Sequence, residues 1–364
     1  MSIDEVLWEM EPHTKAKHEI LKSYLGAWYP ILSSGHQRIV YVDGFAGPGV
    51  YKGGEDGSPI IALKVAQTHP LLSNSKELVF LFIEADERRV NQLKQQIKSI
   101  SLPSNFKVGV ECNSFENSII KVLDSIAGQG KQLAPSFFFI DPFGPTGFPM
   151  ELIKKICNQN RSEVLINFSY QSMNQWFLQD PLKHKSLDLL FGNNNWQKAL
   201  SLDPRKKEEY LRSAYQISLE GLGWKVKPFC MINKHNQTQY YLFFATKNPL
   251  GMSVMKSAMW KSAPTGDFRY SDLSNPAQSN MFEQSYEEQY FRDLANQIYS
   301  KHKGQSVTKK VLVDELAWHP VFIGRHLTGA LKYLENEAHP SCIIDVINRK
   351  KKGSYPDGCT IRFL

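Results

Sequence analysis

The feature that constrains this fold most is a series of short apolar runs separated by longer stretches of helical periodicity. The first five runs are almost continuously apolar and end in polar or acidic residues, as in RIVYVD and SFFFID. Strands of a parallel sheet have this composition because helices cover both faces, and the carboxyl ends of such strands form the ligand site. We therefore predict an α/β fold with a doubly wound, mostly parallel sheet. Its predicted strands are residues 38–43, 78–84, 106–112, 136–141, 163–168, 225–232 and 239–246.

The last two predicted strands differ from the others in their connection. Only the six residues NKHNQT, 233–238, separate them, and a short turn-like segment of this kind joins antiparallel neighbours. We expect an antiparallel hairpin near the C-terminal edge of the sheet.

A loss of periodicity divides the chain. Residues 263–284 collect Pro, Gly, Ser, Asn and Asp, which is the composition of a linker. We place the α/β domain with its N-terminal helix over residues 1–265, a linker over 266–285 and a small domain over 286–364.

The small domain has three stretches of helical periodicity followed by two strand candidates around the basic turn NRKKKGSYPDG. This is the order of elements in a winged helix-turn-helix domain, in which the third helix and the wing contact nucleic acid. The predicted helices are residues 286–302, 309–317 and 321–338, and the predicted strands are 342–347 and 359–364.

The net charge of +7 is concentrated in the same segment, because residues 300–364 hold eleven Lys and Arg against six Asp and Glu. A basic module of this kind indicates an acidic partner, and we expect RNA or DNA. A solvated surface and a protein-docking module are the alternatives. The candidate nucleic-acid-binding residues are Arg325, Lys332, Arg349, Lys350, Lys351 and Lys352.

Composition excludes several classes of protein. The chain is 42% apolar with 21 Phe, 15 Tyr and 7 Trp, which is too rich in core-forming residues for a disordered protein. The five cysteines are widely spaced and the ten histidines show no ligand spacing, so we expect no metal. No apolar run has the roughly 18 to 20 residues that span a bilayer, and the N-terminus lacks a signal pattern, so we expect a cytoplasmic protein without a membrane partner.

A glycine-rich loop follows the first predicted strand with the pattern D-x-F-x-G-x-G over residues 43–49. Neither the Walker pattern nor the complete dinucleotide fingerprint is present. The loop resembles that of class I S-adenosylmethionine-dependent methyltransferases, and Glu84 stands at the end of the second strand, where this family binds the ribose hydroxyls. The resemblance implies a Rossmann-like methyltransferase domain with S-adenosylmethionine as its cofactor. The implied cofactor-binding residues are Asp43, Phe45, Ala46, Gly47, Gly49, Glu84, Ala85, Asn113 and Ser114.

Two details depart from the family pattern. Glu84 lies farther from the glycines than the usual roughly 20 residues, and the insert VYKGGEDGS at 50–58 accounts for part of this distance. Many relatives place an Asp against the adenine at the end of the third strand, whereas this chain has Asn113 and Ser114.

The fourth predicted strand ends in Asp141-Pro142-Phe143-Gly144. Methyltransferases that modify exocyclic amines of bases carry a similar [D/N]-P-P-[Y/F] turn, and the tRNA guanine dimethyltransferase family has Asp-Pro-Phe-Gly. The Asp carboxylate and the Pro carbonyl accept the amine hydrogens, and the aromatic ring stacks on the base. We predict Asp141, Pro142 and Phe143 as catalytic residues. The structural alternative is that Asp141 caps a turn and Phe143 fills the core.

Several segments together resemble the three-Cys-motif partner protein family, over residues 10–364. The family implies a methyltransferase-like domain followed by a winged helix, and a partner whose three-cysteine motif can hold an iron–sulfur cluster. It implies no substrate. The matching segments are HT at 13–14, KHEILK at 17–22, YL at 24–25, FAGPG at 45–49, GSP at 57–59, DPFG at 141–144, VLINF at 164–168 and YLFFATKN at 241–248.

The N-terminal segment carries Trp8, His13, Lys17, Leu21, Leu25 and Trp28 at helical spacing. Such spacing predicts a helix packed against the edge of the sheet. His13 and Lys17 lie one turn apart, and the alternative is that they reach the mouth of the cofactor or substrate site.

Three functions follow from these patterns. The first is an S-adenosylmethionine-dependent N-methyltransferase acting on an exocyclic amine of a nucleobase in RNA or DNA. The second is a cofactor-binding subunit that works only with a three-Cys-motif protein. The third is a DNA-binding regulator that uses the winged helix.

Overall fold

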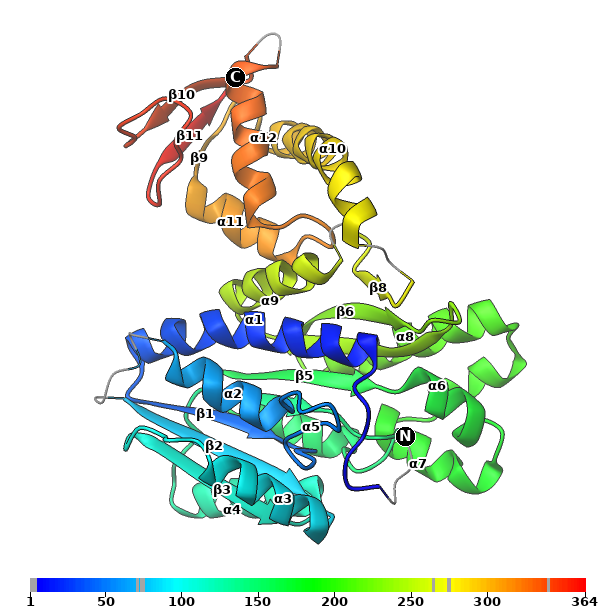
Figure 1. Cartoon of the computed structure of the whole chain (residues 1–364). Coiled ribbons are helices and arrows are strands. Elements are labelled where there is room, and N and C mark those ends of the chain that lie inside the picture. Colours follow the sequence, from blue (N-terminus) through cyan, green and yellow to red (C-terminus); the bar gives the residue numbers. More distant parts are fainter. Residues whose placement is uncertain (1–4, 70–71, 73–75, 264–265, 274–275, 339–340) are drawn as a thin grey trace. The chain divides into compact units, whose positions relative to one another are not determined.

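The computed structural model describes residues 5–69, 72, 76–263, 266–273, 276–338 and 341–364, and within 276–286 it describes the backbone only. The described chain divides into two compact units (Figure 1). The first unit spans residues 1–248 with 269–273, and the second spans 249–268 with 274–364.

The first unit is built on an eight-stranded sheet with the strand order β3-β2-β1-β4-β5-β7-β6-β8. Strands β1 to β5 are parallel, whereas β7 runs antiparallel to both β5 and β6. The prediction of an α/β fold with a mostly parallel sheet and a C-terminal antiparallel hairpin is confirmed. The strands are β1 (Arg38–Asp43), β2 (Glu77–Glu84), β3 (Phe106–Cys112), β4 (Ser136–Ile140), β5 (Ser162–Phe168), β6 (Lys225–Ile232), β7 (Thr238–Thr246) and β8 (Arg269–Ser271).

Helices cover both faces of this sheet, which explains why its central strands are buried along their whole length. One face packs against α1 and α2, with Tyr24 against Phe137 and Tyr29 against Phe80. The opposite face shares a core with α4, α5, α7 and α8. The helices of this unit are α1 (Pro12–Gly35), α2 (Ser58–Gln67), α3 (Glu87–Lys98), α4 (Phe115–Gly128), α5 (Met150–Cys157), α6 (Tyr170–Ser172), α7 (His184–Phe191) and α8 (Pro204–Glu220), with shorter turns at Met173–Phe177, Pro181–Lys183 and Asn195–Ser201.

Helix α1 is tied to the sheet by a buried carboxylate. Glu163 of β5 accepts hydrogen bonds from the Tyr24 hydroxyl at 2.7 Å, the Trp28 Nε1 at 2.9 Å and the Thr246 hydroxyl at 2.6 Å. Burial raises the pKa of Glu163. These contacts join α1 to β5 and β7 and therefore fix the helix across the sheet.

The predicted N-terminal helix is confirmed over most of its length, but Trp8 does not belong to it. Helix α1 begins at Pro12, and residues 5–11 run as coil before it. Pro12 explains the boundary, because proline suits the first turn of a helix, where its missing N–H is not needed.

The second unit contains α9 (Pro249–Ser262), α10 (Pro276–His302), β9 (Ser306–Thr308), α11 (Lys309–Trp318), α12 (Gly324–Asn336), β10 (Ile343–Ile347) and β11 (Thr360–Phe363). Its three strands form an antiparallel sheet in the order β10-β11-β9. Helices α10, α11 and α12 pack with this sheet around one apolar core.

The structure differs from the predicted domain limits. In place of a linker over 266–285 it has strand β8, which pairs with β6, and the first part of α10. Helix α9 groups with the second unit although it precedes residue 265. The buried Lys256 of α9 donates to the carbonyl oxygens of Leu316, Ala317 and His319, which belong to or follow the last turn of α11. Sequence composition cannot reveal such pairings, because they join segments far apart along the chain.

Candidate functional site

A cavity of about 600 Å³ opens at the carboxyl ends of β1, β4 and β5 in the first unit. The glycine loop after β1, the Asp-Pro-Phe turn after β4 and the start of α1 all line it. The structure thus brings the predicted loop residues Phe45, Ala46, Gly47 and Gly49 together with Asp141, Pro142 and Phe143.

The backbone of the glycine loop adopts conformations that require glycine. Gly47 and Gly49 have φ angles of 59° and 78°. A Cβ built on Gly49 would lie 2.7 Å from Cδ1 of Leu93, so the loop packs tightly against α3. The absence of side chains here leaves the loop backbone accessible to a ligand in the cavity.

Asp43 lies beneath this loop and does not line the cavity. Its buried carboxylate accepts hydrogen bonds from the Phe45 N–H and the Tyr41 hydroxyl, both at 3.4 Å, and from the Ser58 hydroxyl. Burial raises the pKa of Asp43 to about 7, and the negative charge of Asp141 acts in the same direction. Asp43 therefore supports the loop from below.

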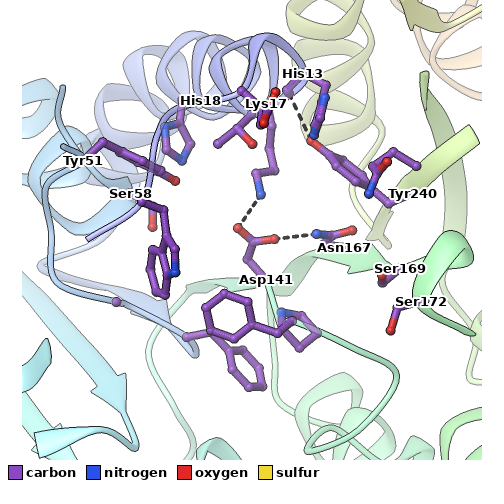
Figure 2. A pocket seen from close by; sticks show the side chains of 18 of the residues that line it. His13, Lys17, His18, Tyr51, Ser58, Asp141, Asn167, Ser169, Ser172 and Tyr240 are labelled. Atoms are coloured by element: carbon purple, nitrogen blue, oxygen red, sulfur yellow. Dashed lines mark hydrogen bonds and ion pairs between the residues drawn. The ribbon is translucent and has the colours of Figure 1, made fainter. Parts of the chain in front are cut away.

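Asp141 is the centre of a polar network that three elements build (Figure 2). The Lys17 ammonium of α1 forms an ion pair with Oδ2 of Asp141. The Asn167 amide at the end of β5 donates to Oδ1 at 2.6 Å. Each carboxylate oxygen therefore has one protein donor and retains acceptor capacity for a ligand.

The alternative prediction was that Asp141 only caps its own turn. Its carboxylate instead contacts side chains of two other elements, Lys17 of α1 and Asn167 of β5. Lys17 is buried, and its ammonium also lies 5.3 Å from the centre of the Tyr240 ring. Its position confirms that the N-terminal helix reaches the site. His13, one turn earlier, lines the same cavity and pairs with Asp272 at 2.9 Å.

Neutral side chains surround the Lys17–Asp141 pair (Figure 2). Burial, reinforced by the Lys17 charge, lowers the pKa of His18 to about 3, so its imidazole is neutral at physiological pH. Burial raises the pKa of Tyr51 and of Tyr240, which keeps both phenols protonated. Ser58, Ser169 and Ser172 complete a lining rich in hydrogen-bonding groups.

Glu84, unlike the residues of the glycine loop, does not face the cavity. Its carboxylate accepts the Gly47 N–H at 3.0 Å and the Asp86 N–H at 2.9 Å, and Arg89 lies 3.7 Å away. Glu84 is buried beside the loop but does not line the cavity.

The other predicted cofactor-binding residues near Glu84, which are Ala85, Asn113 and Ser114, also lie outside the cavity. The Ser114 hydroxyl caps α4 by accepting the Asn117 N–H, and Asn113 accepts the Ser114 N–H. Ala85 follows Glu84 in the turn before α3.

Phe143 lies at the edge of the cavity and is 44% exposed, so it does not fill the core. Its ring meets the Trp8 ring edge-on, with centroids 5.0 Å apart. The guanidinium of Arg89 lies 4.6 Å from the Trp8 ring centre and 5.3 Å from that of Phe143. Trp8 and Arg89 thus join Phe143 and Glu84 in one cluster.

Some predicted nucleic-acid-binding residues are engaged within the second unit. Arg349 pairs with Glu335 at 2.6 Å, and this contact lowers the pKa of Glu335. Arg325 pairs with Glu287 at 2.9 Å. Lys332 and the turn residues Lys350, Lys351 and Lys352 are exposed.

Sequence reasoning missed His18, Asn167, Arg89 and the position of Trp8 in the site. Asn167 carried a usable signal, because it stands one residue before the end of a predicted strand beside that of Asp141. Arg89 carried none, since one arginine on a charged helix is indistinguishable from a solvated one.

Among the described residues, no group of three or more His, Cys, Asp or Glu is arranged to hold a metal ion. None of the described helices is long and apolar enough to cross a membrane.

No protein-family model and no curated protein matches this chain. The resemblance to the three-Cys-motif partner family therefore stays a prediction. Solved structures with a similar fold include an O-methyltransferase from Bacillus cereus in complex with SAH, with 12% identity and a TM-score of 0.34 over 66% of this chain and 83% of that one. Another is the magnesium protoporphyrin IX methyltransferase from Synechocystis with bound SAH, with 13% identity and a TM-score of 0.32 over 66% and 89%.

Proposed function

We propose that this protein is an S-adenosylmethionine-dependent methyltransferase. The observation that carries the proposal is that a glycine loop after β1 and the Asp141 network after β4 line one and the same cavity. In a doubly wound sheet, a ligand binds at the carboxyl ends of the strands, where the strand order reverses. Strand β1 lies at that point, between β2 and β4.

The residues present fit the amino-acid end of the cofactor. The backbone of Ala46, Gly47 and Gly49 borders the cavity, and the two glycine φ angles bring it close. Glu84 would hold the ribose hydroxyls, because a carboxylate accepts two hydroxyl hydrogens. When bound, S-adenosylmethionine supplies an electrophilic methyl group.

Asp141 and the Pro142 carbonyl would hold the methyl acceptor, and an exocyclic amine of a nucleobase fits them best. Both oxygens of Asp141 retain acceptor capacity, so an amine hydrogen can bond there and orient the nitrogen lone pair. Asp141 would then take the proton that the methylated nitrogen loses. The exposed ring of Phe143 offers a stacking surface for the base.

The second unit would supply binding to RNA or DNA. Helices α10, α11 and α12 followed by the β10–β11 hairpin have the order of a winged helix. The exposed Lys332 and Lys350, Lys351 and Lys352 support contacts with phosphates.

The test is transfer of a labelled methyl group from S-adenosylmethionine to total cellular RNA or DNA. We expect transfer by the wild type and at least a ~100-fold loss in Asp141→Asn, because the proton acceptor and its charge disappear. Asp124→Asn, on the exposed side of α4, is the matched control and should be fully active. Equal transfer by Asp141→Asn would exclude Asp141 from the reaction.

One observation favours a second acceptor, a hydroxyl group. The Lys17 ammonium beside Asp141 would stabilise negative charge that develops on an oxygen as Asp141 takes its proton. Digestion of the labelled nucleic acid to nucleosides followed by mass spectrometry separates the two acceptors. Label on an exocyclic nitrogen of the base, identified against standards of the isomeric methylnucleosides, supports the amine, and label on the ribose supports the hydroxyl.

A further inference from the structure

The coil before α1, residues 5–11, is held against the predicted cofactor site, and we call it the N-terminal strap. Its main-chain oxygens are anchored at two points: the Lys52 N–H donates to the Trp8 carbonyl at 2.9 Å, and Arg89 donates to the Glu5 carbonyl at 3.2 Å. Trp8 is only 7% exposed. Because its tryptophan is buried and its main chain is hydrogen-bonded at two points, the strap packs specifically against the first unit.

The Trp8 ring lies against the glycine loop and against Arg89, which is the neighbour of the carboxylate, Glu84, that the proposed function assigns to the ribose. A Cβ built on Gly47 would lie 3.7 Å from Cζ3 of Trp8, which is ordinary van der Waals contact. Arg89, 3% exposed, lies between the two groups, 3.7 Å from Glu84 and 4.6 Å from the Trp8 ring centre. Glu84 thus lies behind Arg89 and Trp8 at the nucleoside end.

The extent of the cavity agrees with this arrangement. The cavity follows the glycine loop and reaches Asp141, but Glu84, Ala85, Asn113 and Ser114 do not line it. The amino-acid end of the cofactor site is therefore open, whereas its nucleoside end is covered. Glu84 is only 6% exposed, so a ribose can bond to its carboxylate only after neighbouring side chains move, and Arg89 with the adjoining Trp8 ring is such a neighbour.

We propose that Trp8 is an affinity-determining residue of the cofactor site, because it occupies the nucleoside end and competes with the ribose and adenine. This inference rests on the proposed function. The strap must leave Gly47 and Arg89 before the nucleoside binds, so only the fraction of molecules with an open strap is competent. The apparent Kd is then the intrinsic Kd divided by that fraction.

The test is calorimetric titration of the full chain with S-adenosylhomocysteine. Trp8→Ala removes the ring that covers the site, and we expect its Kd to be ~10-fold lower than that of the wild type, or lower still. Trp318→Ala, a partly exposed tryptophan of the second unit, is the matched control and should bind like the wild type. A chain that begins at Glu11 is the second variant, because it removes residues 5–10 of the strap, including Trp8, and retains the Glu11 carbonyl that accepts the Lys15 N–H of α1.

A spectroscopic measurement reports the displacement directly. Release of Trp8 into water should shift the tryptophan emission of the wild type to longer wavelength on titration, and this shift should be absent in Trp8→Ala. Equal or weaker binding by both strap variants would overturn the proposal, because Trp8 would then be neutral or would cap the bound nucleoside. Binding by the variants alone supports it. Failure of every chain to bind would instead overturn the proposed function, and the strap proposal with it.

Discussion

Asp43 offers the most direct test of the electrostatics beneath the glycine loop. Its carboxyl is fully buried, and burial raises its pKa from 3.8 to about 7. A carboxyl that prefers its neutral form in the folded state makes folding less favourable as pH rises, because the unfolded chain has already released the proton. The perturbation is Asp43→Asn, which keeps the size of the side chain and removes its titration.

The magnitude follows from the two pKa values. Below about pH 4 the Asp43 carboxyl is protonated in both the folded and the unfolded state, so it does not make the free energy of unfolding depend on pH. Between pH 4 and pH 7 the free energy of unfolding falls by ~1.4 kcal/mol per pH unit, and the loss is complete above pH 7 at ~4 kcal/mol. Between pH 5 and pH 8 the titration of Asp43 therefore lowers the free energy of unfolding by about 2 to 3 kcal/mol.

The assay is urea unfolding of the wild type, Asp43→Asn and the exposed control Asp124→Asn at pH 5 and pH 8. Burial also shifts the pKa of His18 and of Glu163, but the contributions of these groups to the pH dependence are common to all three chains. We expect the wild type and the control to lose about 2 to 3 kcal/mol more between the two pH values than Asp43→Asn does. An equal loss in all three chains would refute the reasoning, since Asp43 would then titrate alike in the folded and unfolded states.

Three further substitutions test packing contacts. Glu163→Ala should lower the free energy of unfolding by ~3 to 5 kcal/mol, because Tyr24, Trp28 and Thr246 lose their buried acceptor, whereas Glu163→Gln should cost much less. Lys256→Met should destabilise the second unit by at least ~2 kcal/mol through the orphaned carbonyls at the end of α11, and thermal unfolding should show no change in the exposed control Lys310→Met. Gly49→Ala should lower Tm and abolish S-adenosylhomocysteine binding, because the new methyl group lies 2.7 Å from Leu93 at a φ of 78°; a normal melting curve with binding intact would contradict the loop geometry.

The predicted strands of the first unit agree with the observed ones to within one residue at each end. Strand β1 occupies 38–43 and β3 occupies 106–112, as expected. The agreement has a physical basis, because a strand buried on both faces must be apolar along its whole length, and such runs are visible in the sequence.

The short strands β8 and β9 were not predicted. Each has three residues and owes its existence to pairing with a strand elsewhere in the chain, β6 for one and β11 for the other. Their own residues carry no signal, since three residues do not establish a periodicity.

The residues of the candidate site also fall into those that the sequence predicts and those that only the tertiary structure brings in. The sequence by itself determined the strand ends, and therefore the positions of the glycine loop and of Asp141, because motif and strand are neighbours along the chain. Only the tertiary structure decided that Lys17, 124 residues away, pairs with Asp141, and that Arg89 contacts both Trp8 and Glu84. These contacts depend on where α1 and the strap cross the sheet, which the packing of α1 and the buried bonds of Glu163 establish.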